Sequence, residues 1–155
     1  MTFGLYGNSS FNQPIGKWDM QLVTNIQYML ANCISFNQDL GNWNVGLVTN
    51  MQGTFNNCVK FNQDISSWNT ANVTTMNSMF NGATSFDQDI SSWNTANVTT
   101  MNSMFDGATL FDQDIRDWDV SNVTNFTGMF TGATAMLAKY PSLSSVSGIQ
   151  AWFNS

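Results

Sequence analysis

A 25-residue period runs through most of the chain and limits the folds open to it. Phenylalanine and tryptophan both recur at that spacing through five units. They are Phe11, Phe36, Phe61, Phe86 and Phe111, and Trp18, Trp43, Trp68, Trp93 and Trp118. Residues 61–85 and 86–110 differ at only three positions, so neighbouring units need nearly the same backbone and surroundings. A stacked array of repeats meets that requirement.

The period also predicts how the chain is divided. Five repeats occupy residues 11–135, a partial N-terminal coil or cap occupies residues 1–10, and an atypical capping coil occupies residues 136–155. Each unit of such an array buries its apolar residues against itself and its neighbours, which leaves both ends open. We therefore expect Ser147 to Phe153 to form a last helical turn that lays apolar side chains over the final coil.

The two halves of each unit predict different secondary structure. In residues 97–108 the apolar positions fall at steps of three and four, which is helical spacing, and Gly107 suits the left-handed residue that follows a helix. Phe86 and Ile90 share one face of an extended segment, which predicts a short strand at residues 88–90. Stacked strands lie about 4.8 Å apart and packed helices about 8 to 10 Å, so the array should curve. The predicted fold class is therefore α/β, a curved leucine-rich-repeat-like solenoid of about five coils, each a short parallel strand plus a short helix.

Composition disfavours several classes of function. Only 9% of the residues are charged, the net charge is −6 and no basic cluster exists, so we expect no nucleic-acid partner. No apolar run is long enough for a transmembrane helix, so we expect no membrane insertion. The chain has no histidine and no glycine-rich phosphate loop, and its acids are periodic whereas catalytic sites are singular. We expect no enzymatic activity.

One acidic row is the main candidate binding surface. Its members are Asp39, Asp64, Asp89 and Asp114. The row should face outward, where closely spaced carboxylates repel one another unless a cation or the basic groups of a partner cover them. Calcium is the less favoured occupant, because no oxygen-rich loop with calcium-site spacing is present. We expect a protein partner or self-association, and no cofactor.

The remaining periodic residues favour structural roles. A glutamine row, Gln13, Gln38, Gln63, Gln88 and Gln113, predicts an internal amide ladder. The tryptophans are better explained as core than as a platform for sugar rings. A threonine row that begins at Thr24 lies in the predicted helix, whose spacing would not match an ice lattice. Cys33 and Cys58 are either two buried thiols or a disulfide between adjacent coils.

The two ends depart from the period and are candidate assembly surfaces. Leu5 and Tyr6 lie in the incomplete first coil, and Trp152 and Phe153 lie close to the C-terminus. An open coil end exposes apolar surface, so one or both ends could dock on another subunit. We therefore take these four residues as candidate assembly ends.

The repeat resembles a known family. Residues 61–83 read F-N-Q-D-I-S-S-W-N-T-A-N-V-T-T-M-N-S-M-F-N-G-A, which is similar to the bacterial surface protein repeat of BspA-like leucine-rich-repeat proteins and of Mycoplasma and Listeria surface lipoproteins. The stretch from Phe55 to Cys58, with Phe61, resembles the A-F-x-x-C-x-x-L element of the same proteins. The resemblance implies surface display, adhesion or host interaction, and it carries over no catalytic residue.

These observations rank three functions. The first is a surface for protein–protein interaction or adhesion. The alternative is a structural subunit of a larger assembly, such as a virion or envelope layer, and the third is a carbohydrate-binding surface, which buried indoles would argue against. Residues 1–7 have neither the cationic start nor the apolar run of a signal peptide. Cytoplasmic synthesis and association with a virion therefore stay open beside the cell surface that the resemblance implies.

Overall fold

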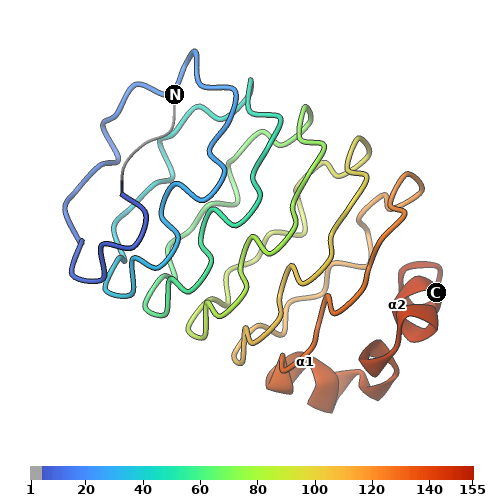
Figure 1. Cartoon of the computed structure of the whole chain (residues 1–155). Coiled ribbons are helices and arrows are strands. Elements are labelled where there is room, and N and C mark those ends of the chain that lie inside the picture. The colour runs from blue at the N-terminus through green and yellow to red at the C-terminus, as the bar shows by residue number, and fades with distance from the viewer. Residues whose placement is uncertain (1–4) are drawn as a thin grey trace.

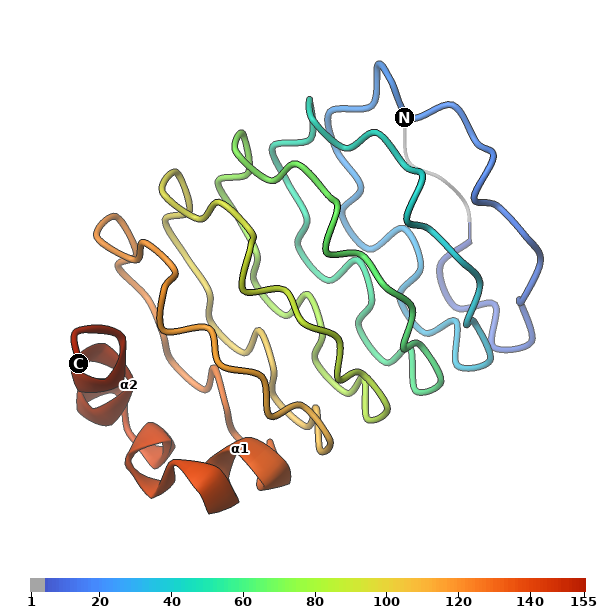
Figure 2. The ribbon, with the colours of Figure 1, turned by 180° about the vertical axis from the view of Figure 1, so that it is seen from behind.

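The molecule is a stack of coils closed at one end by short helices (Figures 1 and 2). The computed structural model describes residues 5–155. We number the coils by repeat: coil 1 is 11–35, coil 2 is 36–60, coil 3 is 61–85, coil 4 is 86–110 and coil 5 is 111–135. The C-terminal cap consists of the helices α1 (Thr134–Lys139), η1 (Pro141–Ser144, a 3-10 helix) and α2 (Val146–Phe153).

The coils contain neither the predicted helix nor the predicted strand. Every helix in residues 5–155 lies in the C-terminal cap. In the coils of this described part of the chain, β pairing is limited to isolated parallel bridges that form no sheet. These bridges join Asn25 to Asn50, Asn50 to Thr75, Thr75 to Thr100 and Thr100 to Asn125. The predicted α/β class is therefore wrong, and so is the curved leucine-rich-repeat-like solenoid with a strand and a helix in each coil.

The predicted helix fails because alternate amides bond outside their own coil. In coil 3, the N–H groups of Met76, Ser78 and Phe80 donate to carbonyls of coil 4, with N···O distances of 2.9 to 3.2 Å. The N–H groups of Met79 and Asn81 bond three residues back and close tight turns. An α-helix needs each N–H to bond four residues back. The apolar spacing of three and four residues therefore reflects successive turns.

Left-handed residues fix these turns. Ser78 has φ 52° and Gly82 has φ 69°, and the equivalent positions of the other coils also have positive φ. The left-handed conformation predicted at Gly107 is confirmed, with φ 70°. Glycine adopts this conformation without steric cost, which explains why three of the five coils have glycine at the position of Gly107.

Aromatic rings stack closely in both the segment predicted as a helix and the segment predicted as a strand, which removes the reason for the predicted curvature. On the side expected to be helical, the ring of Phe80 stacks on those of Phe55 and Phe105 with centroids 5.5 and 5.6 Å apart. In the segment expected to be a strand, Phe86 stacks on Phe61 and Phe111 with centroids 6.0 Å apart, and its ring also lies 3.9 Å from that of Phe80. Packed helices would need about 8 to 10 Å. The ring rows of the two predicted segments therefore repeat at nearly the same spacing from coil to coil.

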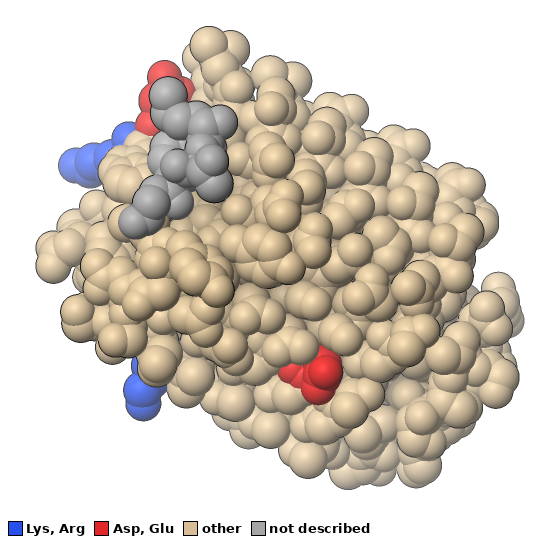
Figure 3. Space-filling model, viewed as in Figure 1, with Lys and Arg blue, Asp and Glu red and all other residues tan. Residues whose placement is uncertain are grey.

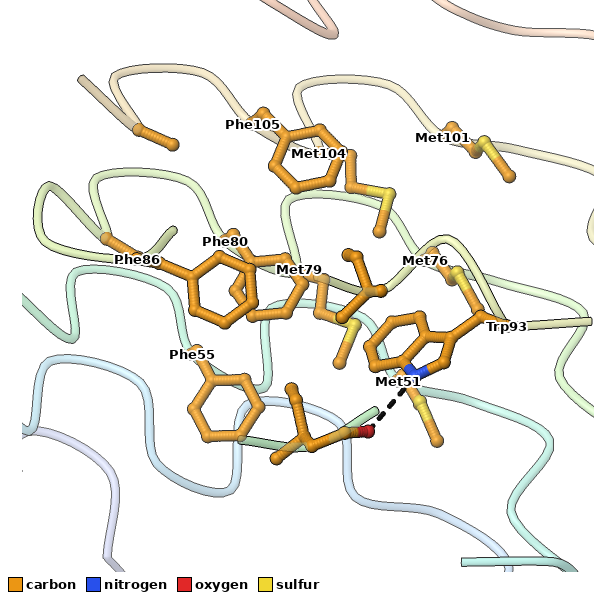
Figure 4. Close-up of a cluster of buried hydrophobic side chains, with 14 of the residues drawn as sticks. Met51, Phe55, Met76, Met79, Phe80, Phe86, Trp93, Met101, Met104 and Phe105 are labelled. Carbon is orange, nitrogen blue, oxygen red and sulfur yellow. Dashed lines mark hydrogen bonds between the residues drawn. The ribbon is translucent and has the colours of Figure 1, made fainter. Parts of the chain in front are cut away.

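The core is a column of aromatic and methionine side chains, part of which is drawn in Figure 4. The four indoles from Trp43 onward are 3% exposed, which confirms the tryptophan row as core, whereas Trp18 at the open end is 39% exposed. Each of these four indoles, Trp43 to Trp118 in the periodic row, donates its N–H to a carbonyl 28 residues earlier. In Figure 4, Trp93 Nε1 reaches the carbonyl of Ile65 at 3.1 Å. The row therefore joins neighbouring coils by stacking and by hydrogen bonds.

The C-terminal cap covers coil 5. The side chain of Ser145 accepts a hydrogen bond from the N–H of Gly148 at 3.1 Å, which caps α2 at its N-terminus. The ring of Phe153 lies 5.8 Å from that of Phe126, and Trp152 meets Phe130 edge-on at 6.2 Å. The helical turn predicted at residues 147–153 is confirmed, whereas α1 and η1 were not predicted.

Candidate functional site

The acidic row faces solvent, as predicted, but it also builds the corners of the coils. Asp39, Asp64, Asp89 and Asp114 are all exposed. Each accepts, through Oδ1, a hydrogen bond from the backbone N–H two residues later, over 2.8 to 3.2 Å. This is the geometry of an Asx turn, in which the side chain replaces a backbone acceptor. The carboxylates therefore have a local structural role.

Neighbouring donors lower the pKa of three carboxylates in this row. The backbone N–H of Ser66 lowers the pKa of Asp64, and the hydroxyl of Ser91 lowers the pKa of Asp89, because both donors favour the charged carboxylate. The pKa of Asp114 is lowered chiefly by the side chain of Arg116, which also makes an ion pair with it at 2.6 Å. These three carboxylates therefore stay ionised at neutral pH.

The structure offers little basis for a metal in this row. Across residues 5–155, no group of three or more histidine, cysteine, aspartate or glutamate side chains could hold a metal ion. Figure 3 shows that charged side chains are sparse on the face drawn there. The carboxylates can accept hydrogen bonds or pair with basic groups of a partner, each acting alone.

The glutamine row links the coils at the surface and does not form an internal ladder. Gln63 is half-buried, and its Nε2 donates to Asn37 Oδ1 of the preceding coil at 2.9 Å. The same Asn37 oxygen accepts the backbone N–H of Asn62 at 2.9 Å. Gln38, Gln88 and Gln113 likewise bond to an asparagine or aspartate of the preceding coil, and the predicted internal amide ladder is wrong.

The side chains of the threonine row also form hydrogen bonds between neighbouring coils. The side-chain hydroxyls of Thr49, Thr74, Thr99 and Thr124 donate to the threonine carbonyl 25 residues earlier, at 3.1 to 3.3 Å. Most of the repeated polar side chains therefore hold one coil to the next. Residues that break the period are therefore the better candidates for specific recognition.

The two cysteines are free, buried thiols, which confirms the first of the two interpretations of the pair. The thiol of Cys33 donates to the carbonyl of Leu5 at 3.1 Å, and that of Cys58 to the carbonyl of Leu30 at 3.0 Å. Burial raises the pKa of both thiols, so neither is activated as a nucleophile.

A groove separates coil 5 from the C-terminal cap, and the sequence did not point to it. Its volume is about 250 Å³. Residues 128–131 form one wall, and the cap side chains Leu137, Leu143, Val146 and Ile149 form much of the other. None of the residues that line this cap groove is charged. It suits an uncharged, largely apolar ligand.

Comparison with known proteins places the chain in a family. The sequence model of a family described as "Mycoplasma protein of unknown function, DUF285" matches residues 1–82 and 38–143. The chain belongs to the DUF285 family. No curated protein and no solved structure matches it. The DUF285 assignment carries no established activity.

The candidate assembly ends of this DUF285 chain differ in accessibility. Trp152 and Phe153 are 7% and 8% exposed, because they pack within the C-terminal cap and over coil 5. Tyr6 is 63% exposed and Leu5 is half-buried. A partner can therefore reach the N-terminal pair, but not the C-terminal pair while the cap is closed. No helix in the described part of the chain is long and apolar enough to cross a membrane.

Exposed apolar side chains gather on coils 1 and 2 of the DUF285 fold. Leu22 is 85% exposed, Leu47 50% and Ile34 44%. At the position of the two leucines, coils 3 to 5 carry asparagines whose Nδ2 donates to the preceding coil, as Asn72 does to the carbonyl of Gly46 at 2.7 Å. Departure from the period was a signal that could have singled out the leucines.

Proposed function

We propose that the chain is a non-enzymatic binding protein that recognises another protein through the exposed leucines of coils 1 and 2. The observation that supports this most strongly is the contrast within one row. Asn72, Asn97 and Asn122 bond to the preceding coil at 2.7 to 2.8 Å. Leu47 gives up that bond, and both Leu22 and Leu47 place apolar surface in water. Such a change costs stability and is expected where a partner covers the side chain.

Family membership and the repeat support a role at the cell surface. The repeat resembles that of BspA-like surface proteins, which implies adhesion or host interaction, and the DUF285 family is described from Mycoplasma. We propose that this chain serves the same kind of interaction. Burial of the tryptophans at 3% exposure disfavours a carbohydrate surface built on stacked indoles.

A capture experiment with a matched variant tests the proposal. Immobilised protein and the double variant Leu22→Asn, Leu47→Asn are incubated with surface proteins of the cells with which the source organism associates. Asparagine occupies the same position in coils 3 to 5, so the variant should fold. Leu110→Asn, at a side chain 57% exposed on coil 4, is the control. We expect the double variant to lose proteins that the wild type and the control retain. Equal capture by all three would refute the proposed surface.

A further inference from the structure

The last coil of the stack has a row of backbone donors without acceptors. Between coils 4 and 5, the N–H groups of Met101, Ser103, Phe105 and Gly107 donate to carbonyls of coil 5 at 2.7 to 3.0 Å. The equivalent donors of coil 5 belong to Phe126, Gly128, Phe130 and Gly132. Among residues 5–155, none of these four N–H groups has an acceptor. The edge of coil 5 is therefore chemically equivalent to an unpaired strand edge.

The C-terminal cap does not fill this edge because it approaches coil 5 through side chains. The chain turns into α1 at Thr134, and the N–H of Leu137 bonds within the helix to Ala133 at 2.9 Å. The rings of Phe153 and Trp152 then cover the core of coil 5. Gly128 and Phe130, two of the four donor residues, line the cap groove, and Phe126 lines a second hollow against the end of α2.

We propose that the cap groove binds an extended, uncharged and largely apolar segment of a partner protein, which adds to coil 5 as a parallel sixth layer. The proposal rests on the proposed function as a binding protein but uses a different surface. The segment would offer alternate carbonyls to the four donors, as coil 5 does to coil 4. In such edge addition, main-chain bonds supply affinity and side-chain pockets supply specificity.

The other wall of the groove favours this occupant. Leu143 and Ile149 are each 2% exposed and form its floor, whereas Val146 is 41% exposed at its rim. Apolar side chains of the segment would contact this wall while its backbone faces coil 5. A complete extra coil would meet the cap, so a short segment fits better. The absence of charge on the lining disfavours a strongly charged segment.

Hydrogen exchange in the free protein is the first test. We expect the amides of Phe126, Gly128, Phe130 and Gly132 to exchange much faster than those of Phe105 and its neighbours in coil 4. Equal protection in the two coils would overturn the proposal, because the edge would then be closed.

The second test uses a peptide with the sequence of residues 75–83, which contains the type of segment that these donors meet inside the stack. We expect saturable binding that slows exchange of the four coil 5 amides, and loss of binding in Val146→Glu, which places a charge at the rim. Leu110→Glu is the matched control and should bind normally. No slowing of the four amides at peptide concentrations up to about 1 mM would overturn the proposal.

The experiments distinguish failure of the proposed leucine surface from failure of the proposed segment-binding groove. Val146→Glu should leave capture by the leucines of coils 1 and 2 unchanged, and Leu22→Asn, Leu47→Asn should leave peptide binding unchanged. If light scattering shows a dimer that Val146→Glu disrupts, the groove holds a second copy of the chain, and the assignment to a separate partner is wrong.

Discussion

Two tryptophans in different surroundings allow the indole hydrogen bond of the core to be measured. Trp93 Nε1 donates to the buried carbonyl of Ile65 at 3.1 Å, and its ring lies between those of Trp68 and Trp118 at 6.2 and 6.4 Å. Trp152 Nε1 is also buried, but it has no hydrogen-bond partner among the described residues. Replacement by phenylalanine removes the same atoms at both sites.

The expected effects differ because one donor is bonded and the other is not. Trp93→Phe removes one of the two hydrogen bonds to the carbonyl of Ile65, which keeps the backbone N–H of Trp68 at 3.1 Å, so the loss costs about 0.5 to 1.5 kcal/mol. The smaller ring loses roughly a further 1 kcal/mol of packing. A total of about 2 kcal/mol should lower Tm by about 4 to 8 °C in a chain of this size. Trp152→Phe loses similar packing but removes an unpaired buried donor, so its Tm should change little or rise.

Calorimetry and urea unfolding of the wild type and both variants would measure the difference. Tryptophan fluorescence monitors both urea transitions, and comparison of two identical substitutions cancels the intrinsic effect of the smaller ring. Coincident transitions by fluorescence and circular dichroism are needed, because repeat arrays can unfold in parts. Equal destabilisation by Trp93→Phe and Trp152→Phe would refute the reasoning, as would a Trp93→Phe variant with unchanged stability.

Three further predictions concern the turns, the acids and the thiols. Gly107→Ala should cost about 1 kcal/mol in urea unfolding, because φ is 70° while the added Cβ would meet its neighbour at an ordinary 3.6 Å, and Gly107→Asn should cost less. Because the pKa values of Asp64 and Asp89 are lowered, their stabilisation should be complete above the ordinary carboxyl pKa of 3.8 and should be lost as pH falls below it. In the double variant Asp64→Asn, Asp89→Asn, the fall in Tm on acidification should be smaller than in the wild type. An equal fall in the two proteins would contradict this prediction. Cys58 should react with a thiol reagent only on unfolding, and rapid labelling of the native protein between pH 7 and 9 would contradict its burial.

The sequence predicts contacts that repeat and misses structure that depends on neighbouring coils. The period correctly assigns the tryptophans to the core and a left-handed residue to Gly107. It misassigns residues 97–108 as a helix, because a run of three-residue turns gives the same apolar spacing. What separates the two is whether the N–H of Met101 bonds within its coil or to Asn125 of the next, as it does at 3.0 Å. That choice is not encoded in local spacing.

The candidate site was less predictable than the core for a related reason. The outward direction of the acidic row follows from the alternation of side chains, but its role in the turns depends on backbone geometry. The cap groove depends on where α1 and η1 place Leu137 and Leu143 against coil 5, and these segments have lost the repeat pattern. The unpaired donors of coil 5 become visible only once the bonds of coils 1 to 4 are known.

The corner next to the acidic row shows that its hydrogen bond matters more than its charge. At that corner Asp19 and Asp119 accept the N–H two residues later at 3.0 and 2.9 Å, and the asparagines of the middle coils, such as Asn69, accept the same bond at 3.2 Å. The chain therefore exchanges aspartate and asparagine freely where only an acceptor is needed. Coils 2 to 5 nevertheless keep aspartate in the row of Asp89, although asparagine could make the same turn. The turn therefore needs only an acceptor at this position, and the ionised carboxylate is the stronger one, because the same hydrogen bonds lower the pKa values of Asp64 and Asp89.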